Sequence, residues 1–214
     1  MKNLMINKST LPNIIIIIFV FWSSCNCFLA QNYQITYEVK FKPVKESDSF
    51  IKENMVLKIA NDQSIFYNLN KNKIDSLASK YNFKAISSIN SSLLRIKVFK
   101  NFSKDYNTVG GNFNQFNYWY KEKKIKYYNL KKYGKYKDYA ASEAFTDFGK
   151  RKWYLIYTND IPINDGPYIF SGLPGLIIKA ESLDGDYTFE LIEIKKLEEK
   201  YLLAENKENI KKKN

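Results

Sequence analysis

The chain has 214 residues, a net charge of +12 and no histidine. Without histidine it lacks the commonest general base, the commonest zinc ligand and every Ser-His or Cys-His nucleophile pair. Its two cysteines, Cys25 and Cys27, both lie near the N-terminus. We therefore expect a protein that is not an enzyme, with no catalytic residues, no cofactor and no metal site.

The N-terminus has the order of a secretory signal. An unbroken apolar run at 14–22 follows Lys2 and Lys8, and small and polar residues come next. This run is too short for a permanent membrane anchor, so we predict a signal peptide over residues 1–30, cleaved after Ala30. The predicted location is the periplasm or the periphery of the outer membrane. In the alternative, a loose lipobox ends at Cys25, which would then carry a lipid.

If the protein is exported, its positive charge can attract only partners that are present outside the cytoplasm. Nucleic acid is not such a partner, whereas an anionic membrane surface or an envelope polymer is. Because the basic residues are scattered along the chain, a role in solubility is the favoured explanation of them. We expect a monomer and keep the anionic membrane surface open as a partner.

Alternating apolar residues predict β-strands along most of the chain. In residues 34–41 the side chains of Ile35, Tyr37, Val39 and Phe41 fall on one face. The same pattern predicts further strands at 55–60, 64–67, 94–99, 116–120, 124–128, 153–157, 176–180 and 187–194.

Two short connections predict hairpins. Asn61 and Asp62 separate the strands predicted at 55–60 and 64–67. Asp184-Gly185 lies between the last two strands, and an Asp-Gly pair flanked by strand patterns is a strong hairpin signal.

The remaining segments delimit the domain. Residues 71–92 are rich in serine and asparagine, and we predict a mobile insertion there, with two helical turns at 73–81 as the only regular element. Residues 197–214 are charged and predict a loose tail. The domain is therefore expected to span 31–196.

Composition supports the same fold class. Aromatic residues make up 16% of the chain and lie mostly in the predicted strands, where cross-strand aromatic pairs stabilise antiparallel sheets. With little helix to cover it, such a sheet must curl to bury its apolar face. We predict a mostly β protein with a single domain, a curved antiparallel sheet or half-barrel, comparable by analogy with LolA-type carriers.

The segment 160–179 is the most distinctive part of the sequence, with three prolines and three glycines among apolar residues. Pro174 and Gly175 suit the central positions of a type II turn, and 164–167 predicts another turn. No lysine or hydroxyl follows these glycines as a P-loop requires. The residues expected to set the backbone geometry are Gly166, Pro167, Gly172, Leu173, Pro174 and Gly175.

The sequence resembles the GLPGLI family of exported Bacteroidetes proteins. The resemblance is carried by 149–153 (GKRKW), 157–163 (YTNDIPI), 165–170 (DGPYIF) and 172–177 (GLPGLI). It is specific from about 151 to 194. The family has no assigned activity, so the resemblance implies a compartment more than a function. Members often carry a cysteine ahead of the Arg-Trp strand, whereas 135–141 has none here.

Four residues are candidates for ligand binding. Arg151 beside Trp153 suits a guanidinium stacked on an indole, which can grip anionic or sugar ligands. The alternative is a strand whose tryptophan packs in the core while the arginine stays solvated. Tyr168 and Phe170 lie between two turns, where they would line a pocket mouth or plug an end of the sheet.

Carboxylates near this segment offer a weaker, enzymatic alternative. A hydrolase would need two of Asp160, Asp165, Asp184 and Asp186 to converge in one cleft. Asp165 and Asp184 each precede a glycine, where aspartate caps turn N–H groups. A calcium site at Asp184 and Asp186 would lack further oxygen ligands.

The sequence thus predicts a non-enzymatic envelope protein that binds an amphiphile, a lipid or a peptide, in the hollow of its sheet. The alternative is an interaction module that adds an edge strand to an outer-membrane partner such as a TonB-dependent receptor.

Overall fold

The computed structural model describes residues 32–46, 48–69, 94–113 and 116–197. The predicted signal peptide, Cys25, the insertion at 71–92 and the tail beyond 197 lie outside these residues. Every element within them is a strand: β1 (Asn32–Phe41), β2 (Ile51–Ala60), β3 (Gln63–Asn68), β4 (Ile96–Asn101), β5 (Tyr106–Phe113), β6 (Phe116–Lys123), β7 (Tyr128–Tyr136), β8 (Tyr139–Phe148), β9 (Arg151–Thr158), β10 (Leu176–Ser182) and β11 (Tyr187–Leu197).

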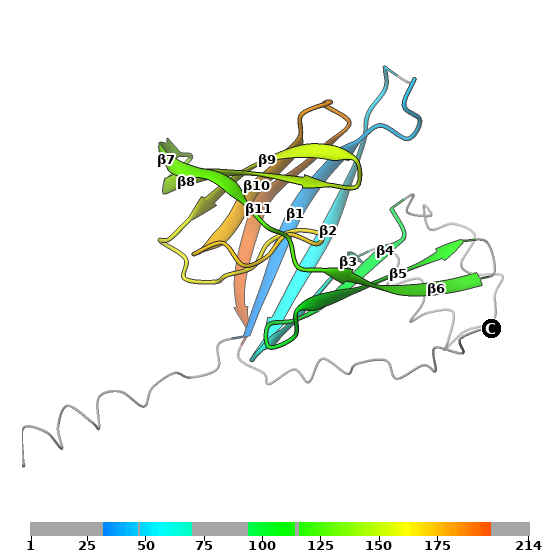
Figure 1. Ribbon diagram of the computed structural model, residues 1–214, viewed down its shortest axis with the longest axis horizontal. Helices are drawn as coiled ribbons and strands as arrows, with labels where there is room; N and C mark the ends of the chain where they lie inside the picture. The colour runs from blue at the N-terminus through cyan, green and yellow to red at the C-terminus, as the bar shows by residue number, and fades with distance from the viewer. Residues whose placement is uncertain (1–31, 47, 70–93, 114–115, 198–214) are drawn as a thin grey trace, which may run out of the picture. The chain divides into compact units, whose positions relative to one another are not determined.

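The strands form one antiparallel sheet in the order β6-β5-β4-β3-β2-β1-β11-β10-β9-β8-β7 (Figure 1). Two meanders, β2 to β6 and β7 to β10, extend from the central pair of β1 and β11. The sheet stays open, with β6 and β7 as its edges. The predicted fold class, a curved antiparallel half-barrel, is confirmed.

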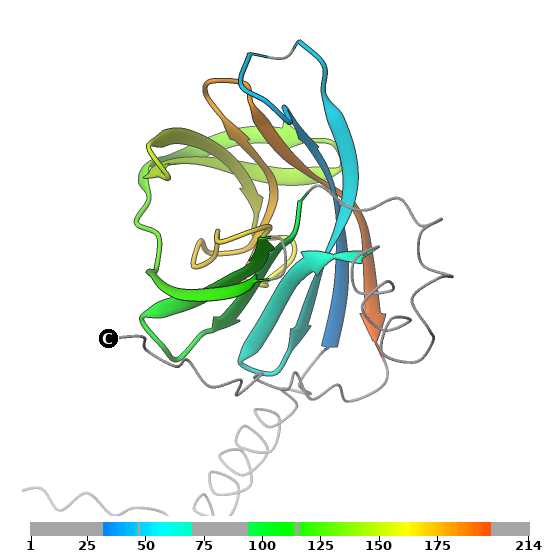
Figure 2. The same cartoon turned by 90° about the vertical axis from the view of Figure 1, so that its right-hand side faces the viewer.

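Register shifts help to curve the sheet. They occur between β1 and β11 at Thr36/Tyr37, between β9 and β10 at Ile177/Lys179, and twice between β7 and β8. Each bulge bends its strand and increases the local twist. Figure 2 shows the sheet curling around the loop that connects β9 to β10.

The inner face of the sheet buries the core in rows of directly opposed residues. One row crosses five strands as Ile35, Leu57, Phe66, Val98 and Val109. All five side chains are at most 2% exposed. Fully burying each of them stabilises the fold by about 1.5–3 kcal/mol. The predicted inward set of 34–41 also lies in this core, so that alternation is confirmed.

Most predicted strands are present with small changes at their ends. The hairpin at Asn61-Asp62 forms, and Asn61 takes φ 55°. The hairpin around Asp184-Gly185 forms as well, because β10 pairs with β11. The strand predicted at 124–128 is wrong, since residues 124–127 form the connection between the two edge strands and β7 begins at Tyr128.

Candidate functional site

The loop of residues 159–175, between β9 and β10, fills much of the hollow of the sheet. Its side chains Ile169, Phe170 and Leu173 are at most 1% exposed. The loop folds back on itself, because Gly172 N–H donates to the carbonyl of Asn164 at 2.9 Å. A large part of the space available to a ligand is therefore taken by the protein's own loop.

The backbone at Pro174 differs from the predicted type II turn. Gly175 N–H donates to the carbonyl of Leu173 at 2.8 Å, two residues back, which is the bond of a γ-turn. The φ of Gly175 is +139°, far from the +80° or so of a type II turn. The reason is the next residue, since Leu176 N–H donates to Ile161 across the loop and leaves the local turn bond unmade.

Lys100 of β4 holds this loop from the inner face of the sheet. Its Nζ lies 2.5 Å from Oδ1 of Asp165, 2.7 Å from the Gly166 carbonyl and 3.3 Å from the Phe170 carbonyl. The ammonium group thus uses all three of its donors on the loop. Both charged side chains are at most 1% exposed.

This ion pair is a structural anchor. Burial lowers the pKa of Lys100, and the nearby Asp165 carboxylate works against that shift. Two charges taken out of water need both mutual attraction and further hydrogen bonds, and here carbonyls supply those bonds. Asp165 also accepts a bond from Gly166 N–H at 2.8 Å, so it caps its turn as well.

Two further side chains fix the loop. Asn107 of β5 donates from Nδ2 to the Ile169 carbonyl at 3.3 Å. The Tyr127 hydroxyl donates to the Ser171 carbonyl and accepts from Ser171 N–H, both at 3.0 Å. Together with Lys100, these contacts tie the loop to β4, β5 and the 124–127 connection.

Held in this way, the loop presents Tyr168 in an unusual conformation. Its φ is +52°, in the left-handed region that costs a residue with a side chain about 1–2 kcal/mol. Tyr168 follows Pro167 in a turn closed by Phe170 N–H on the Pro167 carbonyl at 3.1 Å. Strain of this kind persists where the surroundings enforce it, and it often marks binding sites.

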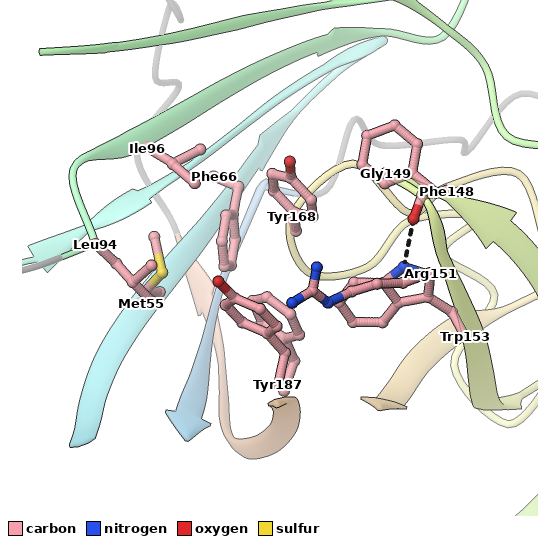
Figure 3. Close-up of a pocket in the computed structure, with 11 residues that line it drawn as sticks. Met55, Phe66, Leu94, Ile96, Phe148, Gly149, Arg151, Trp153, Tyr168 and Tyr187 are labelled. Atoms are coloured by element: carbon pink, nitrogen blue, oxygen red, sulfur yellow. Dashed lines mark hydrogen bonds between the residues drawn. The ribbon is translucent and has the colours of Figure 1, made fainter. Parts of the chain in front are cut away.

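The ring of Tyr168 faces a small apolar cavity. The ring stacks on Phe189 with centroids 6.1 Å apart and planes 3° apart, and it meets Phe148 edge-on at 5.8 Å. The cavity has a volume of about 160 Å³. It is lined by Met55, Phe66, Leu94, Ile96, Phe148, Gly149, Arg151, Trp153, Tyr168, Tyr187 and Phe189 (Figure 3).

The structure brings three of the four predicted ligand residues to this cavity, namely Arg151, Trp153 and Tyr168. Phe170 is fully buried behind them, with its ring 4.9 Å from that of Trp153. Trp153 is itself 4% exposed and donates from Nε1 to the Phe148 carbonyl at 3.0 Å (Figure 3).

Arg151 does not stack on the indole. Its guanidinium lies 5.1 Å from the centre of the Tyr187 ring. It donates to Oδ2 of Asp186 at 2.7 Å, and its Nε lies 2.9 Å from Oδ2 of Asp184 without the alignment of a hydrogen bond. The hydrogen bond to Asp186 raises the pKa of Arg151. Because two carboxylates surround one guanidinium, this corner of the cavity carries no surplus positive charge.

All four carboxylates near the loop have structural partners. Asp165 pairs with Lys100, and both Asp184 and Asp186 face Arg151. Asp160 accepts from Ala140 N–H at 2.8 Å, and Asp184 accepts from Asp186 N–H at 3.2 Å. The described residues include no group of three or more His, Cys, Asp or Glu side chains that could hold a metal ion.

A second hollow, of about 440 Å³, lies between the β7–β8 hairpin and β11. Its polar groups are engaged, since Tyr136 donates to Glu190 at 3.0 Å and Lys137 donates to the Leu191 carbonyl at 3.2 Å. It is also lined by two tyrosines, Tyr136 and Tyr139, and by Lys137 with φ +52°. Lys137 lies in the short turn between β7 and β8, where a positive φ is common, whereas Tyr168 lies in a long loop. No described helix is both long and apolar enough to cross a membrane.

Comparisons with known proteins give a match to a family model over part of the chain, and a likeness in fold. Residues 118–179, from β6 into β10, match a family described as a protein of unknown function, Porph_ging. No curated protein sequence matches the chain.

Among solved structures, PNGF-II in the C2 space group is similar to this chain, with 20% sequence identity and a TM-score of 0.51 over 79% of the chain. PNGF-II in the P21 space group is similar with a TM-score of 0.50 at the same identity. The present chain spans 28% of the length of the first of these proteins, so the likeness concerns part of that protein and its fold alone.

Proposed function

We propose that this protein is an exported, non-enzymatic binding protein of the cell envelope, and that it belongs with the GLPGLI proteins it resembles. Its ligand is an amphiphile, such as a peptide, that inserts one apolar group into the cavity beside Tyr168. The observation that carries the proposal is the strained Tyr168, held by a buried ion pair and facing an apolar cavity.

The volume of the cavity limits the size of the ligand group that can be buried in it. Pockets for drug-sized molecules have volumes of about 300–1,000 Å³, whereas an engineered cavity of about 150 Å³ binds a single benzene. The cavity beside Tyr168, at about 160 Å³, belongs to the second class. The buried part of the ligand is therefore one ring or a short hydrocarbon end, and the rest stays at the surface. A whole lipid chain would need the loop to move.

Titration with 2-phenylethanol, followed by calorimetry, tests the proposal. The phenyl ring matches the cavity in size, and we expect saturable binding with one site. Leu94→Trp places a larger side chain in the wall of the cavity and should abolish binding. The matched control is Leu130→Trp, the same substitution at an exposed position of β7, which should bind as the wild type does.

Variants of Tyr168 distinguish a specific binding site from a packing void. Tyr168→Phe keeps the ring that stacks on Phe189 and should retain binding. Tyr168→Ala removes this ring and should weaken binding at least tenfold. No saturable binding to the wild type, or equal binding to the Leu94→Trp variant, would contradict the proposal.

The alternative, docking of a partner by strand addition, is favoured by one observation. The edge strand β6 pairs with β5 in a continuous register from Phe116 to Lys123 and leaves its other edge open within the described residues. A regular open edge is a template for another strand. Photo-crosslinking in cells from position 119 on β6, with position 130 on β7 as control, tests it. If no protein is captured while a small molecule co-purifies, this alternative is wrong.

A further inference from the structure

The inner face of the sheet continues beyond the cavity onto the edge strand β6. The row that contains Phe66, Val98 and Val109 ends on Tyr120, and the neighbouring row of Ile96 and Gly111 ends on Tyr118. Phe66 and Ile96 line the cavity (Figure 3). The two tyrosines therefore extend rows that begin at the cavity wall.

Gly111 brings Tyr118 close to the cavity wall. A side chain at position 111 would meet the Tyr118 hydroxyl, because a Cβ there would lie 2.5 Å from that oxygen. The Tyr118 ring therefore lies across Gly111, next to Ile96. The Tyr120 ring stacks on that of Tyr118 with centroids 6.4 Å apart, and both residues are 43% exposed.

Glu122 of β6 is a carboxylate on the same face of the strand as the two tyrosines. Glu122 lies directly opposite Asn107, and Asn107 holds the carbonyl of Ile169, the neighbour of Tyr168. Burial raises the pKa of the Tyr168 hydroxyl, and Coulombic interactions with Tyr120, Tyr118 and Glu122 add to the rise. The strand register and the contact of Asn107 with Ile169 place Glu122 and the β6 tyrosines on the face of β6 that is turned toward Tyr168.

Among the described residues that line the cavity, no positive charge is left unpaired. Among the described residues, the ion pairs do not include Glu122. Arg151, the one charged group among the described lining residues, faces two aspartates. The lysines of β6 alternate with its tyrosines and lie on the other face, where Lys121 packs over Tyr106 at 4.3 Å.

We propose that Tyr118, Tyr120, Tyr168 and Glu122 form a cage for a cationic group of the ligand, an ammonium or a guanidinium, next to the apolar cavity. Aromatic faces attract cations, and several tyrosines with a carboxylate form the usual cage for them. The ligand class is then a peptide or amine with a basic group beside its apolar anchor. This inference rests on the proposed function and names the chemistry of its ligand.

Three probes with the same phenylethyl body test the charge preference: 2-phenylethylamine, 2-phenylethanol and 3-phenylpropanoate. With calorimetry on the full exported chain, we expect the amine to bind about tenfold more tightly than the alcohol, and the carboxylate to bind most weakly. High salt should reduce the advantage of the amine, because screening weakens charge interactions near the surface.

Variants of the cage should remove this preference alone. Tyr118→Leu/Tyr120→Leu and, separately, Glu122→Gln should bring the amine to within about twofold of the alcohol while binding of the alcohol stays unchanged. Glu193→Gln changes an exposed carboxylate paired with Lys195 and should have no effect. Circular dichroism and thermal unfolding establish that each variant is folded.

The outcomes distinguish the two proposals. If none of the three probes binds, both the proposed function and the proposed cage are wrong. If all three bind with equal affinity, or the carboxylate binds best, the cavity is a binding site and the cage is wrong. If the Glu122→Gln variant keeps the full preference for the amine and the tyrosine double variant does too, the cage is also wrong.

Discussion

At the scale of single residues, Lys100 shows how one side chain can determine the position of a loop. Lysine is almost never fully buried without a partner, because its ammonium group loses its hydration. Here Asp165 and two loop carbonyls replace that hydration. The same contacts place residues 165–170 in the hollow, so the cavity beside Tyr168 depends on this anchor.

We predict that Lys100→Met destabilises the protein by about 3–5 kcal/mol, because it leaves the carboxylate of Asp165 buried without its cationic partner. The double variant Lys100→Met/Asp165→Asn removes that charge and should recover roughly half of the loss. The measurement is the free energy of unfolding from urea denaturation.

The control for this prediction is Lys97→Met, the same substitution on the same strand but on the opposite face, which should change stability by less than about 0.5 kcal/mol. If Lys100→Met and Lys97→Met cost the same, the ion pair does not stabilise the loop as we describe.

The sequence could not reveal this anchor. Asp165 precedes Gly166, which correctly indicated a capped turn, but its partner lies 65 residues away in a strand whose alternation is otherwise apolar. A lysine on the inner side of a strand is the available signal, and it can be interpreted only once the register is known. The positive φ of Tyr168 has no signature in the sequence either, since it is imposed by contacts from β4 and β5.

At the scale of elements, the loop shows why two glycines of one motif have different roles. Gly175 lies with its Cα against Thr158, and a Cβ there would be 2.1 Å from the Thr158 carbonyl oxygen. Gly172 has φ +95° but open space around the position of a Cβ. The first glycine is required by close approach and the second by its dihedral angle alone.

Gly175→Ala should therefore destabilise the protein by about 3 kcal/mol or more, since a backbone clash adds to the cost of a positive φ. Gly172→Ala should cost only about 1–2 kcal/mol. Urea denaturation of the two variants side by side measures the difference. Equal costs would mean that the loop moves away from Thr158 and that the close approach is not fixed.

The elements that the sequence predicted have either clean alternation, as in β1, or a short unbroken apolar run, as in β9. The missed elements lack both. β5 carries Gly110 and Gly111, which are covered by the rings of Trp119 and Tyr118 from the next strand. β7 is an exposed edge strand with two register shifts. Irregular, lysine-rich edge strands of this kind protect a sheet from pairing with other chains. Their lysines also interrupt the apolar alternation by which a strand is predicted from the sequence.

At the scale of the whole described unit, the cavity joins the two meanders. Met55, Phe66 and Ile96 come from β2 to β4, whereas Phe148 and Trp153 come from β8 and β9. The curled sheet was predictable because apolar alternation without helices requires it. The extent to which a loop fills the hollow was not, since that depends on how a proline-rich connection packs in three dimensions.

Because the cavity is shared in this way, a ligand should stabilise both meanders together. At a free concentration of 100 times its Kd, 2-phenylethylamine should raise the free energy of unfolding by about 2.7 kcal/mol. For a domain of this size the gain corresponds to a rise of about 5–10 °C in Tm. Differential scanning calorimetry should show one transition that moves as a whole. Leu94→Trp should show no rise, whereas Leu130→Trp should behave as the wild type. A ligand that shifts only part of a split transition would show that the two meanders unfold separately and that the cavity does not couple them.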